Sequence, residues 1–286
     1  MEPKALLAAL VTLFFWASAF AGIRAGLLGY SPGHLTLLRF LVASSALLLY
    51  AFFARIPPPR GKDLPRLLVL GVLGITLYHT ALNFGEKTVS AGAASLLIAS
   101  GPVFTALLSY FFLKEKLSLW GWGGILLAFS GAALIAFGEG GGVRLEKGAL
   151  LILLSALSTS FYFVLQKPLF ARYPPQAMTV YTLILGTLPL LFFAPGLGEA
   201  LRTAPLSATL SVVYLGLFPG ALAYFTWTYA LSKTPASRLA SFLYLSPLLA
   251  ILIGYLWLGE VPSPLALLGG GLALLGVLVV NTWGRV

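Results

Sequence analysis

The sequence contains no cysteine, and histidines and acidic residues are scarce: two His and eight Asp or Glu among 286 residues. Without cysteine, disulfides, thiolate metal sites and cysteine nucleophiles are excluded. An enzyme acting on lipids within a membrane would need clustered carboxylates, a metal site or a nucleophile with its base, and few such residues fall within apolar segments. We therefore expect no enzymatic activity, no cofactor and no bound metal.

Charge as a whole is also scarce. Only 9% of the residues are charged and 59% are hydrophobic, whereas an ordinary soluble domain is about one quarter charged. A soluble fold of this length has too little interior to hide so much apolar surface, so the surrounding solvent is predicted to be lipid. The formal charge of +10 does not indicate a nucleic-acid partner, because the Lys and Arg residues stand singly between apolar runs and form no basic stripe.

Apolar runs of the length that crosses a bilayer, roughly 17 to 25 residues, occur ten times. The predicted spans are 5–24, 34–54, 66–85, 91–113, 119–138, 148–170, 177–194, 208–231, 236–258 and 264–283. The runs are apolar on every side and do not alternate in polarity, which favours helices over the strands of a barrel. The fold class is therefore all-α integral membrane, with ten transmembrane helices, and the first run is predicted to be retained as a span, not removed as a signal peptide.

The distribution of Lys and Arg predicts an orientation. If the N-terminus is cytoplasmic, twelve of these residues fall at the inner face and five at the outer face, with Arg39 left inside a span. Cytoplasmic loops carry the excess of basic residues. We therefore expect a multi-pass protein of the cell (inner or plasma) membrane with both termini in the cytoplasm.

A long internal repeat divides the chain. A shift of 145 residues aligns ASGPVFTALLSYFFLKEKLS, residues 99–118, with YLSPLLAILIGYLWLGEVPS without a gap. The same register pairs Pro102 with Pro247, Glu115 with Glu260 and Gly71 with Gly216. Since five helices is an odd number, the second copy must be inverted, so we predict two inverted five-helix repeats at 1–140 and 146–286. Inverted halves that rock around a site near the midplane are typical of secondary transporters.

Proline and small residues recur at matching positions of the two copies. Pro102 and Pro247 each lie inside a predicted span and remove a backbone donor, so we expect kinks turned toward protein or a cavity, serving either as packing kinks or as a gate. The recurring small residues are Gly124, Ala128 and Gly131 with Gly269, Ala273 and Gly276. Such residues let helices approach closely. A contact within the chain is favoured over a dimer interface, and both a monomer and a homodimer stay open.

Polar side chains within spans are costly and mark candidate sites. Arg39 can meet a carboxylate or extend to the interface. Thr76, His79, Asn83 and Glu86 recur every three or four residues along one helix face, as expected for a polar edge on an aqueous cavity. His79 and Glu86 are candidates for proton coupling; the alternatives are a buried, hydrogen-bonded histidine and an interfacial glutamate.

Aromatic side chains suggest the walls of a cavity, because their rings accept both apolar groups and cations. In the eighth span Tyr224, Trp227 and Tyr229 replace the polar groups of the third. Ordinary helix packing and interfacial anchoring are the alternatives. The full set of candidate cavity residues is Trp16, Ser18, Phe20, Arg39, His79, Asn83, Tyr162, Tyr224, Trp227 and Tyr244.

Taken together, these motifs resemble an EamA-type permease of the drug/metabolite transporter superfamily over essentially the whole chain. The residues that carry the resemblance are Pro102 and Glu115 with their repeats Pro247 and Glu260, the segment WASAFAGIRAG that starts at Trp16, and Arg39-Phe40. The resemblance implies an inner-membrane carrier with a central cavity lined by both halves, usually exporting amino acids or related metabolites. Ala19 stands where the family often has Asn, so no substrate contact is carried over at that position.

The function predicted is secondary active export of amino acids or related small metabolites, by alternating access around a central cavity. Export is driven by a proton or by the substrate gradient. The expected partners are the substrate, the lipid bilayer and, where transport is proton-coupled, a proton. ATP-driven transport is excluded because the chain has no G-x-x-x-x-G-K-[ST] phosphate loop. The alternatives are a multidrug or nucleotide-sugar carrier of the same superfamily, and, less favoured, a lipid enzyme or scramblase. A multidrug carrier of cations would want a Glu deep in a span, and a sugar-phosphate carrier several basic residues; Arg39 alone offers little support.

Overall fold

The structure is a computed structural model that describes residues 1–89, 94, 97–138, 147–246, 248–249 and 263–284. Every regular element in these ranges is a helix. In the first half these are α1 Pro3–Leu27, α2 Pro32–Phe53, η1 Gly61–Asp63, α3 Leu64–Gly71, η2 Val72–Leu77, α4 Tyr78–Gly85, α6 Gly101–Leu113 and α7 Leu119–Gly138. In the second half they are α8 Lys147–Gln166, η3 Lys167–Ala171, α9 Pro175–Thr187, η4 Pro189–Phe193, α10 Leu197–Thr203, α11 Leu206–Leu215, η5 Gly216–Leu222, α12 Ala223–Lys233, α13 Ala236–Ser241, η6 Phe242–Leu245 and α15 Pro264–Thr282.

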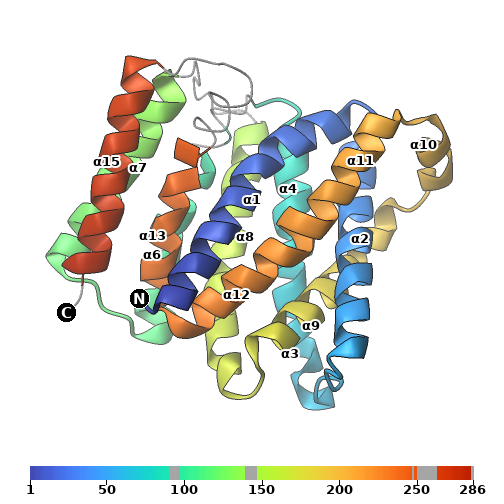
Figure 1. Cartoon of the computed structure of the whole chain (residues 1–286), viewed down its shortest axis with the longest axis horizontal. Helices are drawn as coiled ribbons and strands as arrows, with labels where there is room; N and C mark the ends of the chain where they lie inside the picture. The colour runs from blue at the N-terminus through green and yellow to red at the C-terminus, as the bar shows by residue number, and fades with distance from the viewer. Residues whose placement is uncertain (90–93, 95–96, 139–146, 247, 250–262, 285–286) are drawn as a thin grey trace.

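The predicted spans correspond closely to these helices. Six segments are long and apolar enough to cross a membrane, and the shorter apolar helices Gly101–Leu113, Leu119–Ile135 and Leu267–Thr282 coincide with three further predicted spans. The fourth and ninth predicted spans, 91–113 and 236–258, lie partly outside the described residues. The short helix α10, in the link after the seventh span, was not predicted. Both termini lie at the same end of the bundle (Figure 1).

The third and eighth spans are interrupted at equivalent places. Both change from α-helix to π-helix, over Val72–Leu77 in η2 and over Gly216–Leu222 in η5, and the 145-residue shift superimposes these stretches. Pro219 inside η5 cannot donate a backbone hydrogen bond. Single π turns within α-helices are frequent at functional sites.

A glycine at each interruption allows a helix of the other half to cross closely. A Cβ on Gly71 would lie 2.6 Å from the backbone nitrogen of Gly186 in α9, and a Cβ on Gly216 would lie 2.6 Å from the carbonyl oxygen of Arg39 in α2. Backbone atoms cannot move aside as a flexible side chain can. The paired glycines therefore let the two halves pack closely at their interrupted helices.

The small residues of α7 and α15 form a contact within the chain, as predicted. A Cβ on Gly131 would lie 2.4 Å from the backbone nitrogen of Ala273, and one on Gly276 would lie 2.4 Å from that of Ala128. The two helices run side by side at one edge of the bundle (Figure 1).

The expected kink at Pro102 is instead a break. Ala99 and Ser100 form a turn, and α6 starts at Gly101, so that Pro102 occupies the first helical turn. At this position the missing N–H would have no helical partner in any case. The side chain of Ser160 donates a hydrogen bond of 2.9 Å to the carbonyl of Gly101. Pro247 lies outside the described residues.

Candidate functional site

The two interrupted helices meet through a histidine and a tyrosine. His79, just after η2, lies 3.0 Å through Nε2 from the hydroxyl of Tyr224, just after η5. That hydroxyl donates its one hydrogen to the carbonyl of Gly74 in η2, at 2.9 Å. It must therefore accept from His79 Nε2, which leaves Nδ1 as the unprotonated nitrogen of a neutral ring. Nδ1 is buried and has no hydrogen-bond partner in the described structure.

Tyr162 of α8 packs against the same interruption. A Cβ on Gly74 would lie 2.5 Å from Cγ of the Tyr162 ring, so only glycine fits here without displacement. The Tyr162 hydroxyl is 3.2 Å from the hydroxyl of Thr182 in α9. A ring of the second half thus supports the interrupted helix of the first half.

Trp16 of α1 covers the other interruption. Its Nε1 donates a hydrogen bond of 3.1 Å to the carbonyl of Pro219 in η5. Its ring centroid lies 5.1 Å from that of Trp227 and 5.5 Å from that of Tyr224. Phe163 completes the cluster, 4.9 Å from Trp227. It was not predicted, and an apolar ring within the run SFYFVL gives no signal that separates it from other phenylalanines.

The predicted polar face of the third span turns toward neighbouring helices, not toward an open aqueous edge. Thr76 donates to the carbonyl of Gly186 in α9 at 2.7 Å, and Asn83 donates to Thr36 of α2 at 2.6 Å. The π turn changes the helical phase between these positions, so residues expected on one face contact different helices. His79 is buried and hydrogen-bonded to Tyr224.

Arg39 and Glu86 are the two predicted site residues with a full formal charge. Arg39 is 2% exposed, and its Nε and Nη1 have no hydrogen-bond partner in the described part of the chain. Its guanidinium lies 5.2 Å from the ring centroid of Phe40, which is 4.5 Å from the His79 ring. Oε1 of Glu86 is also buried without a partner there. Burial raises the pKa of Glu86 from 4.5 to about 7, although Arg39 and Arg24 act to lower it.

Two predicted cavity residues lie elsewhere. Ser18 faces α11, where its hydroxyl is bonded to that of Tyr214. Tyr244 packs in a separate cluster with Leu13 and Val277. The side chain of Phe20 lies outside the described residues.

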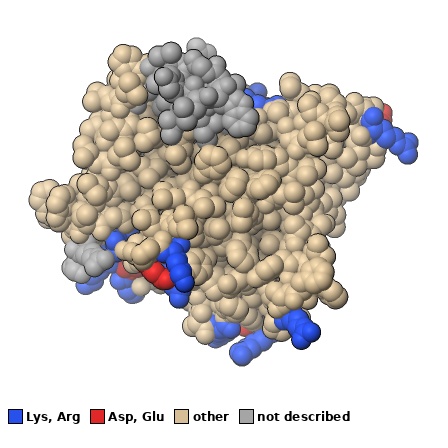
Figure 2. Space-filling model, viewed as in Figure 1, with Lys and Arg blue, Asp and Glu red and all other residues tan. Residues whose placement is uncertain are grey.

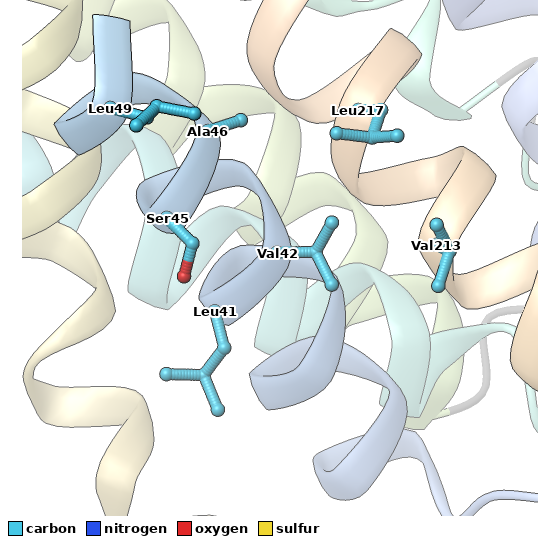
Figure 3. A pocket seen from close by; sticks show the side chains of 7 residues that line it. All are labelled: Leu41, Val42, Ser45, Ala46, Leu49, Val213 and Leu217. Atoms are coloured by element: carbon cyan, nitrogen blue, oxygen red, sulfur yellow. The ribbon is translucent and has the colours of Figure 1, made fainter.

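The centre between the halves is packed. Tyr162, Tyr224 and Trp227 are at most 2% exposed, so the structure shows no open chamber at these side chains, in contrast to the cavity that the family resemblance implies. A shallow groove of about 520 Å³ lies at the surface between α2 and α11 with η5 (Figure 3). It is lined by Leu41, Val42, Ser45, Ala46, Leu49, Val213 and Leu217. With a single hydroxyl, this lining resembles the rest of the apolar surface and not a site for a polar substrate.

At the end of the bundle that carries the termini, Glu115 connects the halves. Its carboxylate accepts hydrogen bonds from the backbone nitrogens of Ala236 and Ser237, at 2.9 and 3.1 Å, and from the Ser237 hydroxyl at 2.8 Å. Lys167 forms an ion pair with it at 3.4 Å. The loop between α6 and α7 is thereby fixed to the start of α13 and the start of η3.

The chain was compared with known proteins. The model of the EamA-like transporter family matches it twice, over residues 3–137 and 146–282.

The chain belongs to the EamA-like transporter family.

It is therefore an integral, multi-pass membrane protein of a transporter family, and the resemblance inferred from its motifs is confirmed, as is the architecture of two repeats. An uncharacterized transporter of Bacillus subtilis, YdfC, is 48% identical over 275 residues, covering 95% of this chain and 90% of the relative. A protein of Streptantibioticus cattleyicolor named as a probable terminal-alkyne amino-acid exporter is 42% identical over 284 residues, covering 99% of this chain and 95% of the relative. A solved crystal structure with 21% identity aligns with a TM-score of 0.82 over 99% of this chain and 100% of its own, and it shares the fold.

Proposed function

We propose that this protein is a secondary active exporter of amino acids or related small metabolites that works by alternating access around the two interrupted helices. The observation that carries the proposal is the equivalence of η2 and η5 under the internal repeat, together with the contact between His79 and Tyr224 that joins them. Helices interrupted at corresponding positions of two inverted halves are the strongest structural pointer to a transporter's binding site.

The substrate class is supported by charge and by relatives. In the described residues the centre holds one buried cation, Arg39, which suits one carboxylate better than the several phosphate charges of a nucleotide sugar. The similar protein of Streptantibioticus cattleyicolor is named as an amino-acid exporter. Arg39, His79, Asn83, Trp16, Tyr162, Tyr224 and Trp227 are the proposed substrate-facing residues.

Alternating access requires that the halves, 1–140 and 146–286, separate at one end while they stay joined at the other. The Glu115 contacts join them at the end with the termini. We assign this end to the cytoplasm, because most Lys and Arg side chains visible in Figure 2 lie along that edge, as cytoplasmic faces require. The structure then corresponds to a state closed toward the cytoplasm.

Proton coupling belongs to the same proposal. Nδ1 of His79 is unprotonated and has no partner among the described residues, so it can accept a proton within the contact that joins the halves. Glu86 can accept one closer to the outer end of α4. Either event would change the charge of the site during the transport cycle.

The test is uptake into liposomes that contain the purified protein, with radiolabelled Phe, Trp, Thr and Leu, with and without an imposed pH gradient. Saturable uptake of one amino-acid class, competed by its analogues and enhanced by the gradient, supports the proposal. Folded protein that transports none of the four, but does transport a cationic dye or a nucleotide sugar, contradicts it.

A further inference from the structure

Arg39 is a buried cation that has no acidic partner among the described residues. It is 2% exposed, and two of its three guanidinium nitrogens, Nε and Nη1, lack hydrogen-bond partners in the described residues. A buried charge left unpaired costs several kcal/mol, and charged side chains inside membrane proteins usually mark the path of a substrate or ion. An anion that arrives from outside the protein would satisfy the guanidinium.

Glu86 supplies an acidic group whose carboxylate is also incompletely bonded. Its Oε1 is buried and has no hydrogen-bond partner among the described residues. The ion pairs formed within that part of the chain are Lys167 with Glu115 and Arg172 with Asp63. Arg39 and Glu86 therefore interact at a distance without direct contact: the guanidinium acts to lower the pKa of Glu86, yet the two groups do not come within 4.0 Å.

The register of α2 against α4 defines the gap between them. The two helices are antiparallel, with Thr36 opposite Asn83 and Phe40 opposite His79. By this register Glu86 lies level with the first turn of α2, about six residues from Arg39. At 1.5 Å per residue their Cα positions differ by roughly 9 Å along the helix axis. The two opposite charges therefore stand at different heights along neighbouring helices, and their charged atoms do not come within 4.0 Å of each other.

An α-amino acid has the charge pattern that matches two opposite charges held apart in this way, because it carries a carboxylate and an ammonium group on one carbon. A simple amine or a simple carboxylate would leave one of the two protein charges unpaired. Guanidinium and carboxylate also match as a pair of parallel hydrogen bonds.

We propose that Arg39 and Glu86 together bind the charged ends of a zwitterionic α-amino acid, the guanidinium holding its carboxylate and the Glu86 carboxylate holding its ammonium group. This inference rests on the proposed function and specifies its substrate class. The substrate side chain then extends past Phe40 and His79 toward the aromatic cluster around Trp16 and Tyr224. Selectivity for a zwitterion comes from two charges on neighbouring helices, and selectivity among amino acids comes from the aromatic cluster.

The experiment measures competition in the same liposomes. The labelled probe is the panel amino acid that is taken up, and the competitors are its amine, which lacks the carboxylate, and its acid, which lacks the amino group. For leucine these are isopentylamine and 4-methylpentanoate, and for phenylalanine phenethylamine and 3-phenylpropanoate. The variants are Arg39→Gln and Glu86→Gln, with Arg202→Gln and Glu199→Gln as controls, since those two charges are exposed on α10.

In the wild type and both controls, each competitor should act on the order of 10- to 100-fold more weakly than the amino acid, as expected when one charged hydrogen bond is lost. In Arg39→Gln, the amine should compete as well as the amino acid, because the partner of the carboxylate is gone. In Glu86→Gln, the acid should compete as well as the amino acid, because the partner of the ammonium group is gone. If Arg39→Gln does not fold, Arg39→Lys keeps the charge and should retain the preference over the amine; loss of that preference overturns the assignment.

Two other results overturn the inference in distinguishable ways. If an amino acid is transported but its amine or acid competes equally well in the wild type, or if the variants keep the wild-type preferences, the two-charge site is wrong and the proposed function stands. If none of the amino acids is transported, both the two-charge site and the proposed function are wrong.

Discussion

The close contact between α7 and α15 makes a sharp prediction about Gly276. Gly276→Ala would place a methyl group 2.4 Å from the backbone nitrogen of Ala128 and 2.6 Å from the carbonyl oxygen of Gly124. Ordinary contacts at Cβ begin at 3.4 Å. Since both neighbours are backbone atoms of a helix, α15 must shift away from α7 by about 1 Å, a gap that forfeits up to about half of the dispersion attraction between facing atoms.

Overpacking of this kind costs about 1 to 3 kcal/mol. A matched control lies on the same helix: a Cβ on Gly271 meets no atom within 4 Å. Both substitutions gain about the same intrinsic helix preference, close to 1 kcal/mol, so the difference between the two variants isolates the effect of the close contact.

The assay is thermal unfolding in detergent, followed by circular dichroism. Gly276→Ala should unfold on the order of 5 °C below Gly271→Ala. If the two variants unfold at the same temperature, α7 and α15 do not approach as closely as described, and the small residues would have to serve another contact.

Three further predictions concern the halves and their charges. Glu115→Gln places an amide N–H, which is a donor, beside the backbone N–H groups of Ala236 and Ser237, and it removes the ion pair. The free energy of unfolding in detergent should fall by about 1 to 3 kcal/mol. An unchanged unfolding temperature would contradict the role given to this contact. Because burial raises the pKa of Glu86 to about 7, its contribution to stability is fully present below about pH 4.5 and lost as the pH rises to about 7. The difference in unfolding free energy between Glu86→Gln and the wild type should therefore shift in favour of the variant when the pH is raised from 4.5 to 8. The same difference at both pH values would refute this. Gly74→Ala brings a methyl group to 2.5 Å from the Tyr162 ring and should reduce transport while membrane insertion is retained, as checked by uptake and by protein yield.

The spans, the repeat and the α7–α15 contact could be predicted from the sequence because each depends on residue type at fixed spacing. Apolar length predicts a crossing, and glycines in one ungapped register predict close approach. These features can be predicted without knowing which helices are neighbours in the folded protein.

The partners of the polar and aromatic side chains could not be predicted in the same way. Lipid and protein interior are both apolar, so periodicity of hydrophobic residues does not tell which side of a membrane helix faces protein. Ser18 and Trp16 lie two residues apart, yet Trp16 bonds the Pro219 carbonyl and Ser18 faces Tyr214. Nothing in the sequence separates those outcomes.

The π turns were missed for a related reason. Pro219 signals an interruption in η5, but η2 has no proline. The π turn in η2 occurs where α9 crosses closely at Gly71 and where the Tyr162 ring packs against Gly74. Both contacts are made by residues far away in the chain. The repeat offers the one available signal, since an interruption in one half predicts an interruption at the equivalent position of the other.

The central claim is that substrate is handled where the two interrupted helices meet. Its most direct test compares amino-acid uptake by Tyr224→Phe with uptake by Tyr229→Phe, because Tyr224 joins His79 to the Gly74 carbonyl and Tyr229 lies on the same helix α12. Losing these hydrogen bonds should slow uptake about 5- to 10-fold in Tyr224→Phe and leave Tyr229→Phe close to the wild type. Equal uptake by the two folded variants would contradict the account.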